Sequence, residues 1–162
     1  MIKSKGVFFT NSFEETQNLG KEFVASVTRS LLREGDSLLN VVALYGDLGS
    51  GKTTFVQGLA RGLGITRRII SPTFIIVRSY KTGIRNQESG IRNFYHIDLY
   101  RTVSEKDIQG LGIEGIIEDP QNIVAIEWAE KMGDLLPKKR WDVRLEYAGE
   151  DKRRITIKNG RN

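Results

Sequence analysis

Residues 46–54 read Gly-Asp-Leu-Gly-Ser-Gly-Lys-Thr-Thr and match the phosphate-loop pattern G-x-x-x-x-G-K-[ST]. A loop of this kind curls tightly enough to aim several backbone N–H groups at the oxygens of a polyphosphate, and its glycines make that curl possible because they carry no Cβ. Lys52 can extend along the phosphates toward the β and γ groups, and Thr53 can offer its hydroxyl to Mg²⁺. The pattern predicts a bound nucleoside triphosphate.

Two acidic residues are candidates to hold magnesium from a second direction, as phosphate-loop enzymes require. Glu127 ends the apolar run 123–126, and Asp98 ends the more mixed run 94–97. The usual acid at such a place is Asp, so Glu127 is an atypical choice whose longer side chain reaches the metal directly or through water. We expect both acids to lie near the metal.

Three further features near these acids each admit two interpretations. Segment 71–74, Ser-Pro-Thr-Phe, either presents Thr73 to the metal or to water, or forms a Ser-Pro turn before a strand. His96, the only histidine, is more typical of a hydrogen-bonded core residue than of a catalyst. Trp128 is more typical of packing than of a stacking platform.

The segments on either side of the loop supply the context that a phosphate loop requires. Residues 41–44 form a short apolar run suited to a strand buried on both faces. After the loop, Gly64 ends a series of apolar residues at helical spacing: Phe55, Val56, Leu59, Ala60 and Leu63. A strand running in and a helix running out argue against a glycine-rich turn that binds nothing.

The remaining periodicities predict an α/β fold. Other strands are expected at 6–10, 73–80, 94–99, 122–126, 141–147 and 154–157. Further helices are expected from the Ser12 cap through Leu32, with Gly35 as a stop, and from Ser104 through Gln109. Segment 81–93 is interpreted as an extended hairpin tip. Together these elements predict a three-layer αβα architecture of the phosphate-loop NTPase type, with a central mixed, partly parallel sheet and antiparallel terminal strands.

Length and composition limit the class of protein. The 162 residues, 39% of them hydrophobic, fit one globular domain over residues 1–162. The absence of cysteine excludes disulfides and thiolate metal sites and suits a reducing compartment. Neither an apolar run of about 18 residues nor the apolar core of a signal peptide occurs, so we expect a cytoplasmic protein without membrane contact.

The charge of the chain is compatible with two kinds of surface. The net charge is +5, and basic residues are concentrated after residue 137. Clustered cations fit a nucleic-acid partner. Aromatic residues are not interleaved with these cations in the way that single-strand binding requires, so a solvated basic face is the simpler interpretation.

The loop by itself leaves the base and the reaction open. Guanine-selective phosphate-loop proteins commonly carry Asn/Thr-Lys-x-Asp, and the nearest string, residues 104–107, has the wrong order, so adenine is preferred. A small-molecule kinase is the main alternative to an ATPase, but it needs an arginine-rich lid, and Arg67 and Arg68 are the only compact pair near the loop. A third alternative is a non-catalytic nucleotide sensor, for which replacing Asp98 by Ala leaves turnover unchanged.

Four strings taken together resemble the bacterial TsaE family in order and approximate spacing. They are the loop at 46–54, Ser-Pro-Thr-Phe at 71–74, His-Ile-Asp-Leu-Tyr-Arg at 96–101 and Ile-Glu-Trp at 126–128. The similarity spans nearly the whole chain, and the segment 81–93 departs from it by being longer than the family minimum. The loop is common to many families, whereas the last two strings are specific in combination.

The resemblance implies a small ATPase that assists synthesis of the threonylcarbamoyl modification on the adenosine next to the anticodon of tRNA. Its implied partners are the TsaD and TsaB proteins, with TsaC supplying threonylcarbamoyl-adenylate, so that contact with tRNA is indirect through the complex. Its implied cofactors are ATP and Mg²⁺.

The resemblance also assigns roles to residues of this sequence. Magnesium binding falls to Thr53 and Glu127, and a catalytic role falls to Asp98. The implied nucleotide contacts are Asp47, Leu48, Gly49, Ser50, Gly51, Lys52, Thr53 and Thr54 of the loop, with Thr10, Asn11 and Arg154 approaching from outside it. The mechanistic hypothesis is that Lys52 and Mg²⁺ neutralise the phosphates while Asp98 orients or deprotonates the attacking water. Because no arginine is clearly placed as a transition-state finger, slow turnover alone and stimulation by TsaD and TsaB are expected.

Overall fold

The computed structural model describes residues 5–34, 40–71, 76–84, 90–102 and 104–160, and within them one seven-stranded sheet runs in the order β1-β7-β6-β2-β5-β4-β3. Its strands are β1 (Gly6–Thr10), β2 (Val41–Tyr45), β3 (Val77–Lys81), β4 (Asn93–Asp98), β5 (Asn122–Glu127), β6 (Arg140–Tyr147) and β7 (Arg153–Gly160). The helices are α1 (Phe13–Glu34), α2 (Lys52–Gly62), α3 (Glu105–Gln109), α4 (Ile113–Glu118) and the 3₁₀ helix η2 (Ala129–Leu135).

The centre of the sheet is parallel and its two edges are antiparallel. β2 pairs in parallel with both β5 and β6, and β5 pairs in parallel with β4. The pairs β1–β7, β6–β7 and β3–β4 are antiparallel. Every residue of β5 is buried, as expected for a parallel strand covered on both faces. The predicted mixed sheet is therefore confirmed.

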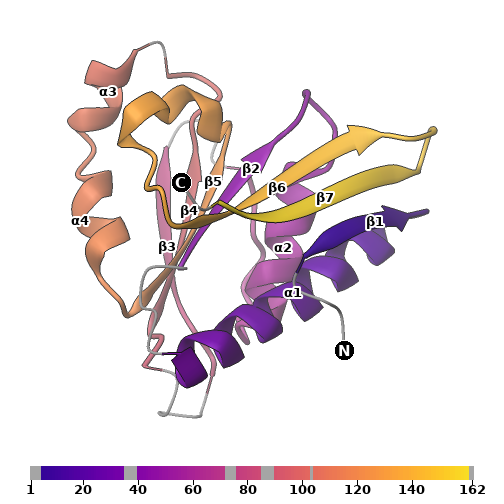
Figure 1. The fold of residues 1–162 in the computed structure, drawn as a ribbon, viewed down its shortest axis with the longest axis horizontal. Coiled ribbons are helices and arrows are strands. Elements are labelled where there is room, and N and C mark those ends of the chain that lie inside the picture. The colour runs from indigo at the N-terminus through magenta and orange to yellow at the C-terminus, as the bar shows by residue number, and fades with distance from the viewer. Residues whose placement is uncertain (1–4, 35–39, 72–75, 85–89, 103, 161–162) are drawn as a thin grey trace.

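Helices cover both faces of this sheet (Figure 1). Alternate residues of β2 belong to two different hydrophobic clusters, because successive side chains of a strand point to opposite faces. Val42 and Leu44 pack in the cluster with α1 and α2, whereas Val41 and Ala43 pack in the cluster with α3, α4 and η2. The three-layer αβα architecture is confirmed.

The local sequence patterns predicted most of the helices and strands, and the exceptions have physical reasons. The Ser12 and Ser104 hydroxyls accept the predicted capping bonds at the starts of α1 and α3. β3 begins at Val77, and residues 72–75, like Gly35 and the 85–89 part of the hairpin tip, lie outside the described residues. The sequence did not predict α4 or η2. Each is at most seven residues long, too short for a clear 3.6-residue period, and each contributes apolar residues to the cluster on its face of the sheet.

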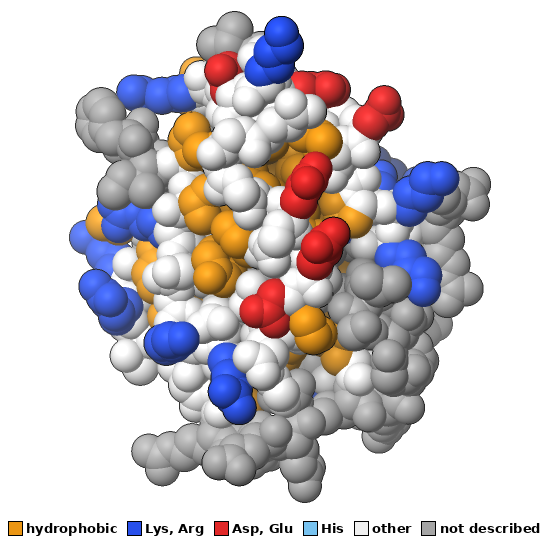
Figure 2. Space-filling view, turned by 90° about the vertical axis from the view of Figure 1, so that its left-hand side faces the viewer, with side chains coloured by type: hydrophobic (Ala, Val, Ile, Leu, Met, Phe, Trp, Pro, Cys, Tyr) orange, Lys and Arg blue, Asp and Glu red, His pale blue; other side chains and the backbone are white. Residues whose placement is uncertain are grey.

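The face formed by α3 and α4 carries a group of acidic side chains. Figure 2 shows acidic side chains across this face around exposed apolar patches, with Lys and Arg toward its edges. Exposed acids on these two helices are Glu105, Asp107, Glu114 and Glu118. The positive net charge of the chain is thus unevenly distributed. Among the described helices, none has the length and apolar character needed to cross a bilayer.

Candidate nucleotide-binding site

The phosphate loop connects the buried strand β2 to the first turn of α2. Three of its residues have backbone angles in the left-handed region, with φ of 143° at Gly46, 77° at Gly49 and 102° at Gly51. Residues with a Cβ rarely adopt these angles, so the loop conformation requires the glycines of the motif. Gly51 is the N-cap of α2, and the positive end of that helix therefore lies at the loop.

A cavity of about 510 Å³ lies between this loop and the carboxyl ends of β4 and β5. Ligands of open α/β sheets bind outside the carboxyl ends of the strands, and the cavity occupies that position. The loop side is lined by Gly49, Gly51, Lys52, Thr53 and Thr54. The opposite side is lined by Ser71, Asp98, Tyr100, Arg101, Glu127 and Trp128.

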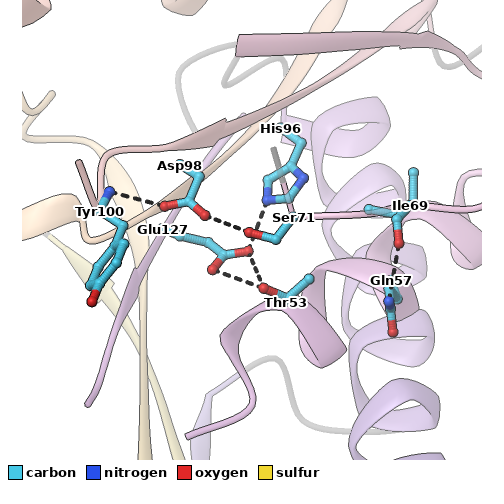
Figure 3. A network of polar contacts seen from close by, with 8 residues as sticks. All are labelled: Thr53, Gln57, Ile69, Ser71, His96, Asp98, Tyr100 and Glu127. Carbon is cyan, nitrogen blue, oxygen red and sulfur yellow. Dashed lines mark hydrogen bonds and ion pairs between the residues drawn. The ribbon is translucent and has the colours of Figure 1, made fainter. Parts of the chain in front are cut away.

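Glu127 connects the loop helix to the interior of the sheet (Figure 3). The Thr53 hydroxyl lies 2.9 Å from Oε1 and 3.1 Å from Oε2 of the Glu127 carboxylate. Nε2 of His96 lies 2.8 Å from the same Oε1. Because an ionised carboxylate only accepts hydrogen bonds, Nε2 carries the proton in this arrangement. His96 is fully buried and Glu127 is 3% exposed, so the carboxylate is held in one orientation.

Asp98 lies next to Glu127 in the sheet but is bound by different groups (Figure 3). The two residues are register partners on the parallel strands β4 and β5. The Ser71 hydroxyl donates to Oδ2 of Asp98 over 2.7 Å, and the Tyr100 N–H donates to Oδ1 over 3.0 Å. Both carboxylate oxygens are thereby oriented, and the residue remains partly exposed in the cavity.

Lys52 is buried although it carries an amine. Its Nζ donates to the carbonyls of Gly46 at 2.6 Å and Asp47 at 2.9 Å, and it lies 4.0 Å from the centre of the Trp128 ring. Burial lowers the pKa of Lys52 below its usual value, and nearby carboxylates, Glu127 foremost, oppose that shift. A buried cation against the loop favours an anionic ligand in the adjoining cavity.

Trp128 has an unusual backbone conformation. Its φ is 58°, and it is the one residue other than glycine with a positive φ among the described residues. The ring packs on Tyr100, with centroids 5.2 Å apart, while its face lies against the Lys52 amine. The expected packing role agrees with these contacts. Such a backbone conformation costs energy and is typical of functional sites.

The oxygen donors of the site fit a magnesium ion that is shared with a ligand. Thr53 and Glu127 together offer a hydroxyl and a carboxylate, which are donors that Mg²⁺ prefers. Over the described ranges, no group of three or more His, Asp or Glu side chains is arranged to hold a metal ion alone. Magnesium usually keeps few protein ligands and takes the rest from phosphates and water, so this donor set is suitable for that mode of binding.

The structure brings together some of the predicted site residues and not others. Asp98 and Glu127 line one cavity together with Leu48, Gly49, Gly51, Lys52, Thr53 and Thr54 of the loop. Asp47 and Ser50 are not among its lining residues, and Thr73 lies outside the described residues. Thr10 does not line the cavity, and its hydroxyl lies 2.8 Å from that of Thr16. Asn11 is also outside the lining, with its amide groups bonded to Glu15.

Arg154, the arginine expected near the nucleotide, does not line this cavity. Arg154 pairs with Glu146 at 2.8 Å and lines a different cavity, while the neighbouring Arg153 contacts the back of the phosphate loop. The alternation along the last strand distinguishes the two arginines. Arg153 is on the same side of the strand as the buried residues Ile155 and Ile157, because side chains two residues apart share a face. Sequence reasoning also missed Tyr147, which bonds to the loop, and Arg101, which lines the cavity.

Comparisons with known proteins agree with this arrangement. The family model for the threonylcarbamoyl adenosine biosynthesis protein TsaE matches residues 10–155. The chain is 38% identical to the tRNA threonylcarbamoyladenosine biosynthesis protein TsaE of Bacillus subtilis, over 83% of this chain and 76% of that protein. It is 37% identical to the protein of the same name from Rickettsia bellii, over 98% of this chain and 97% of the relative.

A solved structure has a similar fold. The crystal structure of YdiB from Bacillus subtilis superimposes with a TM-score of 0.70 and 29% identity, covering 99% of this chain and 88% of that one. Together with the family match over most of the chain, this similarity leads to one conclusion. The chain belongs to the TsaE family of tRNA threonylcarbamoyladenosine biosynthesis proteins.

Proposed function

We propose that this chain is a magnesium-dependent ATPase of the cytoplasm that supports threonylcarbamoyladenosine modification of tRNA together with the TsaD and TsaB proteins. One observation carries the proposal. The loop residue Thr53 contacts the buried carboxylate of Glu127 beside the buried amine of Lys52. A hydroxyl, a carboxylate and an amine at one loop match the needs of a triphosphate bound with a divalent cation.

Each residue has a distinct part in the proposed reaction. The backbone N–H groups of the loop and the Lys52 amine bind the phosphate chain, while Thr53 and Glu127 hold magnesium. When bound, the ion neutralises charge on the β and γ phosphates. Lys52 gives up its carbonyl partners for phosphate oxygens, which are better partners for a buried cation.

Asp98 is proposed to act on the attacking water. Its two oxygens are oriented by Ser71 and Tyr100, and each retains lone pairs for a further hydrogen bond. A fixed carboxylate in a cavity can orient water or accept its proton as bond formation begins. The proposed transfer of the γ-phosphoryl group to water releases ADP and inorganic phosphate.

The choice of adenine and of partners rests on sequence and family. The guanine-recognition string is missing from the chain, and the relatives are named for modification of tRNA. Leu48 and Tyr100, 66% and 47% exposed, line the cavity next to the loop, and a partner protein contacting them would cover its opening. Such a partner could supply a transition-state arginine, which is worth about 10³ to 10⁵ in rate in related enzymes.

The decisive experiment measures phosphate release from ATP with and without the TsaD–TsaB pair, for the wild type, Glu127→Ala and Asp98→Ala. The proposal expects slow release alone, stimulation by the pair and a large loss in both variants. Full-speed release without any gain from the partners contradicts the regulatory part. A phosphorylated acceptor in place of free phosphate would identify a kinase, and unchanged turnover in Asp98→Ala would exclude the catalytic role of that residue.

A further inference from the structure

Behind the phosphate loop, the end of the β6–β7 hairpin contacts three consecutive loop carbonyls. The Tyr147 hydroxyl donates to the carbonyl of Leu48 over 2.8 Å. Arg153 donates through Nε to the carbonyl of Ser50 over 3.0 Å and through Nη2 to that of Gly49 over 3.4 Å. These contacts join segments that are about one hundred residues apart in sequence, and we refer to Tyr147 and Arg153 as the hairpin clamp.

The loop glycines are required for this contact as well as for the loop's own curl. A Cβ at Gly49 would lie 2.6 Å from the Tyr147 hydroxyl, and one at Gly46 would collide with the backbone carbonyl of Leu145. Real Cβ atoms do not approach other atoms so closely, and the backbone of β6 cannot move aside as a flexible side chain could. The hairpin therefore packs against the loop at two of its glycines, Gly46 and Gly49.

Arg153 is fully engaged with backbone groups. Besides its bonds to the loop, Nη1 donates to the carbonyls of Glu150 at 3.0 Å and Lys152 at 2.9 Å, and more weakly to that of Gly149 at 3.5 Å. The guanidinium also lies 4.5 Å from the centre of the Tyr147 ring. The cation thus connects the turn at the end of the hairpin with the phosphate loop, and its three donor nitrogens face backbone carbonyls.

The planarity of the peptide bond converts these contacts into an effect on the opposite side of the loop. In a trans peptide the carbonyl of one residue and the N–H of the next point in opposite directions. Holding the carbonyls of residues 48–50 against the hairpin therefore turns the N–H groups of residues 49–51 away from it. The Ser50 N–H donates to the Asp47 carbonyl within the loop over 3.1 Å, so the argument concerns the N–H groups of Gly49 and Gly51. Gly49 and Gly51 line the cavity, so this is the direction in which a phosphate would lie.

We propose that the hairpin clamp holds the loop in its phosphate-binding conformation and thereby sets the affinity for the phosphate chain of the nucleotide. Arg153 and Tyr147 are positioning residues, which act through the loop backbone. This inference rests on the proposed function. When a binding-competent conformation is only partly populated, the apparent affinity falls by that fraction, and loss of the clamp lowers the fraction.

The test compares the affinity of four variants by calorimetry, using ATP, ADP and inorganic tripolyphosphate as ligands. Tyr147→Phe keeps the ring and removes the hydroxyl, and we expect affinity to fall about fivefold for all three ligands, the equivalent of one hydrogen bond. Arg153→Gln is expected to weaken binding about tenfold or more, because it removes charged hydrogen bonds. Arg153→Lys restores the charge without the planar fork, so its affinity should lie between those of Arg153→Gln and the wild type.

Lys158→Ala serves as the matched control, since it removes an exposed cation from the same strand on the face away from the loop. Its affinity should equal that of the wild type. Melting temperatures of the free proteins establish that each variant is folded. In the intact variants, a KM for ATP that rises while kcat stays near the wild-type value is the kinetic sign of this positioning role.

Hydrogen exchange of the free protein gives an independent measurement. Amides of residues 49–51 should exchange faster in Tyr147→Phe than in the wild type, while those of β5 should not change. Weaker binding with unchanged exchange would contradict the positioning explanation. If the wild type binds ATP and the clamp variants bind it equally well, only this inference is wrong. If the wild type binds none of the ligands, the proposed function is wrong and the inference fails with it.

Discussion

Glu127 and Asp98 occupy equivalent places at the ends of neighbouring parallel strands, yet their surroundings differ. Glu127 is 3% exposed and is held by a residue of the loop helix and by a buried imidazole. Asp98 is partly exposed and is held by Ser71, which follows α2, and by a backbone N–H beyond its own strand. A carboxylate fixed to the loop is suited to metal binding, whereas one open to the cavity is suited to contact with water. The following predictions test this division of roles.

Replacing Glu127 with Gln is expected to have the largest effect. The change keeps the size of the side chain but removes the charge that compensates a divalent cation, so turnover of ATP should fall by about 10³-fold or more. Calorimetric titration with ATP, with and without Mg²⁺, should show that the metal no longer tightens nucleotide binding. An intact magnesium dependence in this variant would assign the metal to another residue.

Replacing Asp98 with Asn should reduce turnover by about 10²-fold, the usual size of a general-base contribution. Because Asp98 is not needed for the metal in this division of roles, the affinity for ATP with Mg²⁺ should stay near the wild-type value. Phosphate release and binding must therefore be measured on the same preparation. Equal losses of affinity in the Asp98 and Glu127 variants would show that the two acids share one role.

The buried imidazole supports Glu127 from the side opposite to the loop. Removing the Nε2 donor with His96→Leu should weaken apparent magnesium affinity about tenfold, as is typical when a partner of a metal ligand is lost. His96→Gln places an amide nitrogen near the position of Nε2 and should recover most of that affinity. Magnesium titrations monitored through ATP binding measure both effects, and melting curves establish that the core remains folded. A similar loss in both variants would instead indicate a packing role.

Ser71 gives the smallest expected effect, because it supports the more exposed acid. Ser71→Ala removes one hydrogen bond to the Asp98 carboxylate and should reduce turnover about fivefold while leaving ATP affinity unchanged. Ser71→Thr keeps the hydroxyl and serves as the matched control. A loss of magnesium affinity in Ser71→Ala, measured as for Glu127, would contradict the separation of the two acids.

Much of the fold followed from local patterns because most elements are long or strongly apolar. Val41 to Leu44 and Ile123 to Ile126 are continuous apolar runs, and both became central strands. The loop, Asp98 and Glu127 were predicted from motif and from position at strand ends, and the structure places them around one cavity. Strand ends were informative because parallel strands bring their carboxyl ends to one edge of the sheet.

The contacts that the sequence did not reveal depend on pairing between distant strands. The bond between His96 and Glu127 requires β4 and β5 to be adjacent and parallel, which no local pattern states. Which of the two arginines, Arg153 or Arg154, contacts the phosphate loop depends on which face of β7 is turned toward the loop. A shift of one residue along a strand moves a side chain to the other face, so small uncertainty about a strand boundary changes the assignment completely.

The order of the strands has a consequence for synthesis of the protein. β6 and β7 are translated after the other described strands, yet they lie between β2 and β1, and β6 flanks the strand that enters the phosphate loop. During translation, the whole phosphate loop leaves the ribosome before these two strands have been made. At that stage this part of the sheet is still incomplete. Because chains emerge from the N-terminus first, the site can reach its final form only after residues 140–160 have left the exit tunnel.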